Sequence, residues 1–282
     1  MPDPTIGWHA HLDVWALVAA LGVGYWVALR RWGPRHVSPG EPPASRTQVT
    51  CFVLGLGTLW LASDWPIHEL AEERLFSVHM VQHLLMSLVA PPLLLAGTPG
   101  WLLRSLLRPR WLFAVVRRLA RPLPALVLFN AFIAFSHWPL VVDLAVRSEL
   151  AHFTLHAVLV ATALLMWMPV LSPMFEIPRL RYAGQMLYLF AQSIVPTVPA
   201  TFLTFADGPI YPFYGLAASL IGIDPVTDQR VAGLIMKIIG GLILWGLIAV
   251  LFFRWHRQEE LGGTDAPGWQ EVEREANRVG VR

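Results

Sequence analysis

The sequence has few charged residues, and this shortage restricts the class of protein it can encode. Charged residues make up 14% of its 282 positions and hydrophobic residues 55%, whereas a soluble globular domain carries roughly 25% charged and about 45–50% apolar residues. Apolar runs long enough to cross a bilayer occupy almost the whole chain. A single membrane domain is therefore the simplest interpretation of the composition.

The chain also has almost no cysteine. Cys51 is the one example, which excludes an intrachain disulfide and any CxxC motif for a metal or redox group. Its apolar neighbours favour packing over the alternative role of a soft metal ligand. A basic region ahead of the first apolar run is missing too. Asp3 and Asp13 stand there instead, so this run is interpreted as a retained helix and not as a cleaved signal peptide.

Seven apolar segments approach the ~20 residues that a helix needs to cross ~30 Å of hydrocarbon. They predict an all-α bundle of seven transmembrane helices, forming one domain over residues 1–257 with a polar tail over 258–282. The predicted spans are 11–30, 47–65, 76–97, 121–138, 148–171, 182–205 and 231–254. Internal prolines are predicted to kink the third and the sixth: Pro91 and Pro92, and Pro196 and Pro199.

Arginines concentrate in the loops after the first, third, fifth and seventh spans, while the alternate loops are acidic. By the positive-inside rule this places the N-terminus outside and the C-terminus in the cytoplasm. The alternation requires an odd number of spans. The inner segment 101–118 alternates apolar residues with arginine and is predicted to lie in the headgroup layer of the bilayer.

With this topology, most of the histidines fall outside or in the outer half of a span: His9, His11, His68, His79, His83, His137, His152 and His156. His36 and His256 fall at the inner face. Ionisable residues within spans are costly and usually face the bundle interior or a wet cavity. The outer group is therefore the candidate functional site.

Spacing indicates a metal. His79 and His83 are four residues apart, hence neighbours on one helix face, and His152 and His156 repeat the pattern. Met86, seven residues after His79, is expected on the same stripe, and His137 at the same depth. Imidazole suits copper, zinc, iron and nickel, whereas a thioether favours Cu(I). Three polar side chains are candidates for orienting the rings: Glu149, Asp64 and Gln82.

Other interpretations stay open at this point. One HxxxH pair arises by chance often enough, and Met86 alone is typical of core packing. Three histidines with a nearby carboxylate also fit a zinc-dependent membrane hydrolase. Histidines on facing helices fit a haem-binding electron carrier, which would need a haem-sized gap between them.

Three stretches resemble the polytopic bacterial CtaG family of cytochrome c oxidase assembly factors. They are FSVHMVQHLLMSLVAPPLLLAGTP (76–99), the stretch 135–173 beginning FSHWPLVVD, and DQRVAGLIMKIIGG (228–241). The resemblance implies a multi-pass protein of the bacterial plasma membrane, not an enzyme, that matures a haem–copper oxidase. The family's histidines map onto His79, His83, His152 and His156, with His137 and Asp228 as further matches. Lys237 departs from the pattern, where a tryptophan is expected, and is expected to repel a metal ion or to pair with an acid such as Asp228.

The sequence therefore predicts a copper-handling assembly factor. Acidic outer loops attract the cation, His9, His11 or His68 makes the first contact, and the two histidine pairs with Met86 hold Cu(I). The expected partners are oxidase subunits, a soluble copper carrier and the lipid bilayer, with no nucleic acid. The loop 208–215 is either a docking surface or an aromatic loop at the headgroups. Copper binding by histidine is expected to weaken as the pH falls through ~6.5.

Overall fold

The computed structural model describes residues 11–263, and within that range the secondary structure is helical, without a strand. The first part of the chain forms α1 (Leu12–Val27), which continues through a π segment η1 (Ala28–Trp32) and a short turn η2 (Gly33–Arg35), then α2 (Arg46–Ser63) and α3 (Ile67–Glu73). A long broken helix follows: α4 (Phe76–Leu84), the π segment η3 (Leu85–Val89) and α5 (Ala90–Gly97).

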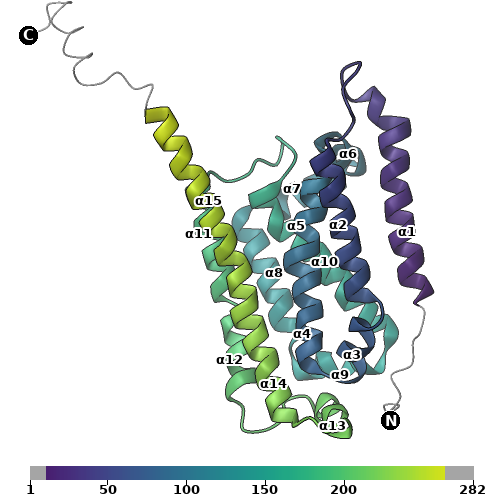
Figure 1. The fold of residues 1–282 in the computed structure, drawn as a ribbon, viewed down its shortest axis with the longest axis vertical. Coiled ribbons are helices and arrows are strands. Elements are labelled where there is room, and N and C mark those ends of the chain that lie inside the picture. The colour runs from purple at the N-terminus through teal and green to yellow at the C-terminus, as the bar shows by residue number, and fades with distance from the viewer. Residues whose placement is uncertain (1–10, 264–282) are drawn as a thin grey trace, which may run out of the picture.

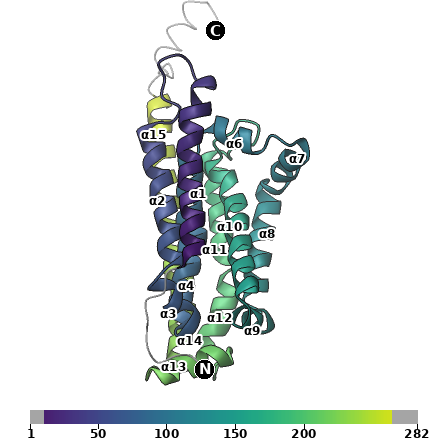
Figure 2. The ribbon, with the colours of Figure 1, turned by 90° about the vertical axis from the view of Figure 1, so that its right-hand side faces the viewer.

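The remaining elements follow in chain order. They are α6 (Gly100–Leu106), α7 (Arg110–Leu119), α8 (Pro122–Ser136), α9 (Pro139–Arg147), α10 (Glu149–Leu171), α11 (Tyr182–Ile194), α12 (Thr197–Phe205), α13 (Pro212–Leu220), α14 (Pro225–Leu234), the π segment η4 (Ile235–Ile239) and α15 (Gly240–Gly263). Figures 1 and 2 show the long helices running side by side as a bundle. The short helices α3, α9 and α13 lie at one end of the bundle, and α6 and α7 lie at the other.

Five helical segments are long and apolar enough to cross a membrane: Leu12–Arg35, Phe76–Gly97, Glu149–Leu171, Tyr182–Phe205 and Pro225–Glu260. A sixth is added if α7 and α8, which meet at an angle of 83°, are counted as one bent span. Large apolar side chains are exposed around the bundle, among them Leu123, Phe153, Phe202 and Phe253. A surface with so many exposed apolar residues marks a membrane protein.

Most of the predicted spans therefore correspond to membrane-length helices, and two do not pass the same test. The predicted span 47–65 is the helix α2, whose polar residues lower its hydropathy. The predicted span 121–138 is α8, which has 15 residues and falls short by itself. The sixth span is divided between α11 and α12 at Pro196, as its prolines predict.

Small residues bring α2 and α5 close together. A Cβ atom at Gly97 would collide with the backbone of Phe52, so no larger residue fits there. Gly97 ends α5, and its carbonyl accepts a hydrogen bond from the Tyr25 hydroxyl of α1 at 2.9 Å. Glycine at such contacts lets membrane helices pack closely where the hydrophobic effect gives no drive. This contact ties α1 and α2 to the central helix.

Pro91 explains how the central helix is built. A proline has no N–H, so the carbonyl of Ser87, four residues earlier, loses its helical partner. The indole Nε1 of Trp167 on α10 donates to that carbonyl at 2.9 Å, and Trp167 is 1% exposed. The π segment η3 lies directly before the proline pair. This hydrogen bond fixes α10 against the broken helix.

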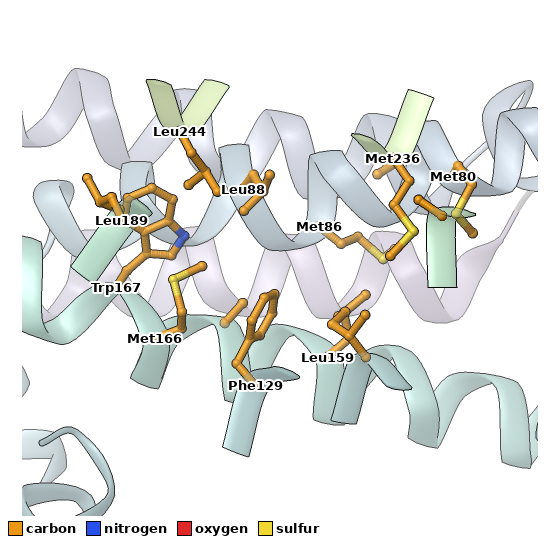
Figure 3. Packing of buried hydrophobic residues seen from close by; sticks show 14 of the residues in the cluster. Met80, Met86, Leu88, Phe129, Leu159, Met166, Trp167, Leu189, Met236 and Leu244 are labelled. Atoms are coloured by element: carbon orange, nitrogen blue, oxygen red, sulfur yellow. The ribbon is translucent and has the colours of Figure 1, made fainter. Parts of the chain in front are cut away.

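One large apolar core fills the space between the broken helix, α8, α10, α11 and α15. Figure 3 shows part of it. It includes the thioethers of Met80, Met86, Met166 and Met236, all at most 8% exposed. The histidines occupy the end of this core nearest α3, α9 and α13, where α4 and α10 begin.

Candidate metal centre

Four imidazole rings come together from two helices. His79 and His83 lie one turn apart on α4 with ring centroids 4.3 Å apart, and His152 and His156 on α10 are separated by 4.2 Å. The two pairs face each other, with 5.4 Å between His83 and His156 and 6.1 Å between His79 and His156. The four-residue spacing sets each pair, and the packing of α10 against the broken helix brings the pairs together.

Three nitrogen atoms form a set that can hold an ion. One ring nitrogen each of His79, His83 and His156 lies within 4.8 Å of the other two. Nδ1 of His79, Nδ1 of His83 and Nε2 of His156 are buried and have no hydrogen-bond partner among the described residues. A buried polar atom without a partner costs about 1–3 kcal/mol. A metal ion bound by these three rings would remove this cost for each nitrogen that ligates it.

Glu72 joins a second set with His152 and His156, again with donor atoms within 4.8 Å of one another. Its Oε1 lies 2.7 Å from Nε2 of His152 and 2.9 Å from Nδ1 of His68. Burial opposes ionisation of this carboxyl, but the contacts with His152 and His68 outweigh it and lower the pKa of Glu72 to about 2. The carboxylate is therefore charged throughout the physiological range.

The sequence prediction missed Glu72 as a site residue. It placed Glu72 among several acidic residues in a loop between spans, with nothing to distinguish it from Glu69 or Glu73. The structure folds this stretch into α3, which packs on α4 and turns Glu72 toward the rings. The useful signal was the spacing of four residues between His68 and Glu72.

A large cavity, here named the acidic cavity, leads from the surface to these ligands. It has a volume of about 650 Å³ and is lined by the carboxylates Asp13, Glu69, Glu72, Glu73 and Glu149, by the histidines His11, His68, His152 and His156, and by Met86. His11 Nε2 lies 3.2 Å from Glu69 Oε1. Burial disfavours a charge on His68, but Glu72, Glu69 and Asp13 outweigh this and raise the pKa of its ring.

A second and much smaller space is here named the histidine cavity. Its volume is about 20 Å³, and His79, His83, His152 and His156 contribute to its walls together with Tyr214. A water molecule needs roughly 10–15 Å³ by such a measure. The histidine cavity therefore accommodates a single ion or one to two water molecules. A porphyrin is too large for the histidine cavity.

Comparison with protein families agrees with this architecture. Residues 23–258, most of the chain, match the family described as cytochrome c oxidase caa3 assembly factor (Caa3_CtaG). The chain belongs to the CtaG family. No curated protein and no solved structure matches it significantly. Family membership connects this CtaG protein with the assembly of cytochrome c oxidase.

His137 lies beside His83 in this CtaG protein but outside both ligand sets. Its ring packs perpendicular to that of His83 with centroids 5.7 Å apart. Met86 belongs to η3 and lines the acidic cavity beside His152 and His156, whereas His79 and His83 line the histidine cavity. The predicted His-His-Met stripe therefore divides between two cavities.

The other predicted residues of the CtaG protein have structural partners. Asp64 accepts a hydrogen bond from Trp15 Nε1 at 2.7 Å, which joins α1 to the end of α2. Gln82 donates to the Ala62 carbonyl at 2.8 Å and lies 3.4 Å from Nδ1 of His68. Gln82 therefore lies beside a histidine ring, whereas Asp64 contacts a histidine only through its backbone carbonyl, which accepts from His68 N–H at 3.0 Å.

Asp228 and Lys237 do not form the expected pair. The Asp228 carboxylate accepts hydrogen bonds from the backbone N–H groups of Phe76 and Ser77 at 2.8 and 3.2 Å. Lys237 donates to the hydroxyl of Thr197 instead. Asp228 thus holds the first turn of α4, the helix that carries His79. His9 lies outside the described residues.

Proposed function

We propose that this CtaG protein binds Cu(I) at His79, His83 and His156 and delivers it to cytochrome c oxidase during assembly. The observation that carries the proposal is that His79, His83 and His156 each place one ring nitrogen within 4.8 Å of the other two, and that each of these rings has a buried nitrogen without a hydrogen-bond partner among the described residues. Imidazole is a good ligand for copper, and the nearby thioether of Met86 favours the Cu(I) state.

The acidic cavity supports the delivery of a cation to this site. Carboxylates with low-dielectric walls concentrate the field and raise the local concentration of cations. Glu72 stands where the cavity meets the rings and contacts both His68 and His152. In this scheme the ion first binds Glu72, His152 and His156. It then moves to His79 and His83, with His156 belonging to both ligand sets. The protein is not an enzyme in this scheme, since the ion is carried and not transformed.

We also propose that the protein has seven spans in the bacterial plasma membrane, with α3, α9 and α13 on the outer face. Arginine-rich α7 and the C-terminal end of α15 then lie at the cytoplasmic side, where the positive-inside rule expects them. In a Cys51→Ala background, Ser219→Cys on α13 is expected to react with an impermeant thiol reagent in intact cells. Ser105→Cys on α6 is expected to react only after the cells are broken, and the reverse pattern would overturn the orientation.

The copper proposal is tested by metal analysis of detergent-purified protein after loading with Cu(I). The wild type is compared with His79→Gln/His83→Gln, which keeps polar side chains of similar size in α4. His36→Gln/His256→Gln is the matched control, because these rings stack on or pair with residues elsewhere, Trp101 and Glu260. Copper retained by the wild type and the control but lost from the α4 variant supports the proposal.

Two other results overturn it. Negligible copper in all three proteins leaves the cluster as a partner-binding or structural feature. Stoichiometric zinc in the protein as purified, retained against added Cu(I), favours the hydrolase alternative, because three imidazoles and one open position also suit Zn²⁺.

A further inference from the structure

Lys237 occupies an unusual position for a lysine. Lysine and arginine together number 21 in the chain, and Lys237 is the only lysine. It belongs to η4, inside the membrane-length segment Pro225–Glu260, and it is the one charged residue between Arg230 and Arg254. At a rise of 1.5 Å per residue it lies about 10 Å along the helix from Arg230 and about 25 Å from Arg254. The residue is therefore within the hydrocarbon layer, where a charge is costly.

Lys237 lies on the outside of the bundle. Charged residues within spans usually face the bundle interior or a wet cavity, whereas Lys237 is exposed. Leu234 and Ile238 on the same helix and Val198 on α12 are exposed apolar side chains. Figure 1 shows α11 and α12 beside α15 and α14 at one edge of the bundle, with α1 at the opposite edge. The only lysine of the chain thus stands in an apolar face that meets lipid in the free protein.

Thr197 is the polar partner of Lys237 among the described residues. The lysine Nζ donates to Thr197 Oγ1, and the Thr197 hydroxyl itself donates to the carbonyl of Ser193. None of the ion pairs within residues 11–263 includes Lys237. An ammonium group has three N–H donors, and one hydroxyl oxygen accepts from one of them here. The lysine therefore has no counter-ion within the described part of its own chain.

The hydrogen bond keeps the ammonium group at the depth of its own helix turn. A Cβ atom at Gly233 would meet Ala200 and Thr204 of α12. Lys237, four residues further along its helix, reaches Thr197, which precedes Ala200 on the antiparallel α12. A lysine that snorkels extends its side chain along the helix toward the headgroups. Lys237 extends sideways to the neighbouring helix, which favours a partner at the same depth over a lipid headgroup.

A cavity opens beside this lysine. It has a volume of about 50 Å³, and its lining includes Lys237, Ser193 and Gly241, with His137 among the other wall residues. A Cβ atom added at Gly241, one turn after Lys237, would meet no atom within 4 Å. The hollow is large enough for the carboxyl group of an entering side chain, since one water needs roughly 10–15 Å³ by such a measure. Glycine also lets membrane helices approach closely. This surface is here named the lysine face and consists of Ser193, Thr197, Lys237 and Gly241.

We propose that the lysine face docks a transmembrane helix of cytochrome c oxidase that carries an aspartate or glutamate, whose carboxylate pairs with Lys237. Charged residues within membranes pair with one another, and membership of the assembly-factor family indicates the oxidase as the source of the helix. A second copy of this chain is a poorer match. Asp228 on the same helix is buried and bound to α4, and the acids of α15 lie at its far end. The inference does not depend on the proposed copper site.

The test is amine–carboxyl crosslinking in membranes of cells that make both the full-length protein and the oxidase. Dicyclohexylcarbodiimide, a lipid-soluble reagent, condenses an amine with an adjacent carboxyl group into an amide and leaves as the urea. Because the chain has no other lysine, every lysine crosslink of this protein starts at Lys237. Mass spectrometry is expected to find Lys237 joined to an aspartate or glutamate in a membrane helix of an oxidase subunit.

Two variants at the same position form a matched pair. Lys237→Leu removes the charge and is expected to lose both the crosslink and the oxidase that is isolated with the wild type. Lys237→Arg keeps the charge, so it is expected to retain the oxidase but to give no crosslink, because a guanidinium stays protonated. Both variants are expected to fold, since the side chain is exposed, and gel filtration of the purified proteins checks this.

Three results would overturn the proposal. Lys237 joined to a second copy of this chain would make the lysine face a contact between copies. Lys237 joined to lipid alone would mean that the side chain reaches the headgroups. Equal recovery of the oxidase with Lys237→Leu and with the wild type would show that the charge does not contribute to docking. None of these results bears on the copper proposal, because copper is measured on the purified protein alone.

Discussion

Replacing Asp228 by alanine is expected to loosen the first turn of α4 and so weaken the metal site without touching a ligand. The side chain is 5% exposed, and its two oxygens accept from the N–H groups of Phe76 and Ser77 at 2.8 and 3.2 Å. These are among the N–H groups that a helix leaves without intrahelical partners. His79 follows within the same turn, so its ring depends on this contact for its position.

The magnitude follows from the two hydrogen bonds. A bond to a charged acceptor contributes about 1.5–3 kcal/mol. Because water can replace part of each bond near the end of the bundle, the lower value applies, and the unfolding free energy of Asp228→Ala is expected to fall by about 3 kcal/mol. Asp228→Asn keeps one acceptor oxygen and should lose about half of that. Loss of a group that orients a ligand typically lowers metal affinity about 10–100-fold.

Both quantities can be measured on the same preparations. Unfolding in mixed micelles gives the stability change, and competition with a Cu(I) chelator gives the affinity. Asp224→Ala is the matched control: Asp224 caps the same helix, α14, by accepting from Thr227 N–H at 2.8 Å, but it is exposed and its described side-chain hydrogen bonds go to Thr227 and not to α4. Copper affinity in Asp228→Ala equal to that of Asp224→Ala would refute the reasoning, because the position of His79 would then not depend on Asp228.

Three further results are expected. Glu72→Gln should slow copper uptake and make the uptake rate less dependent on salt than in the wild type, because the mutation removes a charge from the acidic cavity. Unchanged uptake kinetics would exclude Glu72 from the route. Trp167→Phe leaves the Ser87 carbonyl without its donor and should cost about 1–3 kcal/mol of unfolding free energy; an unchanged value would mean that another group satisfies this carbonyl. Copper loading should fall as the buffer is made mildly acidic, because a histidine nitrogen must be unprotonated to bind a metal ion. Because the pKa of Glu72 is about 2, that carboxylate stays charged in this range and cannot cause the loss.

Much of the fold follows from local properties of the sequence. Runs of apolar residues predict the membrane helices because hydrocarbon thickness sets their length. The break at Pro196 follows from a missing N–H. The pairing of His79 with His83, and of His152 with His156, follows from helix geometry alone. None of these features needs information about distant parts of the chain.

Features that depend on distant contacts were not predictable in the same way. The π segment η3 and its neighbouring hydrogen bond join Ser87 to a tryptophan 80 residues later, and η3 moves Met86 out of the stripe that regular α-helix spacing predicts. The helix α3 turns Glu72 toward the rings. It has seven residues and no long apolar face, so the hydropathy pattern predicts a loop there. Likewise, the sequence places His137 near the cluster, but only packing shows which cavity it lines.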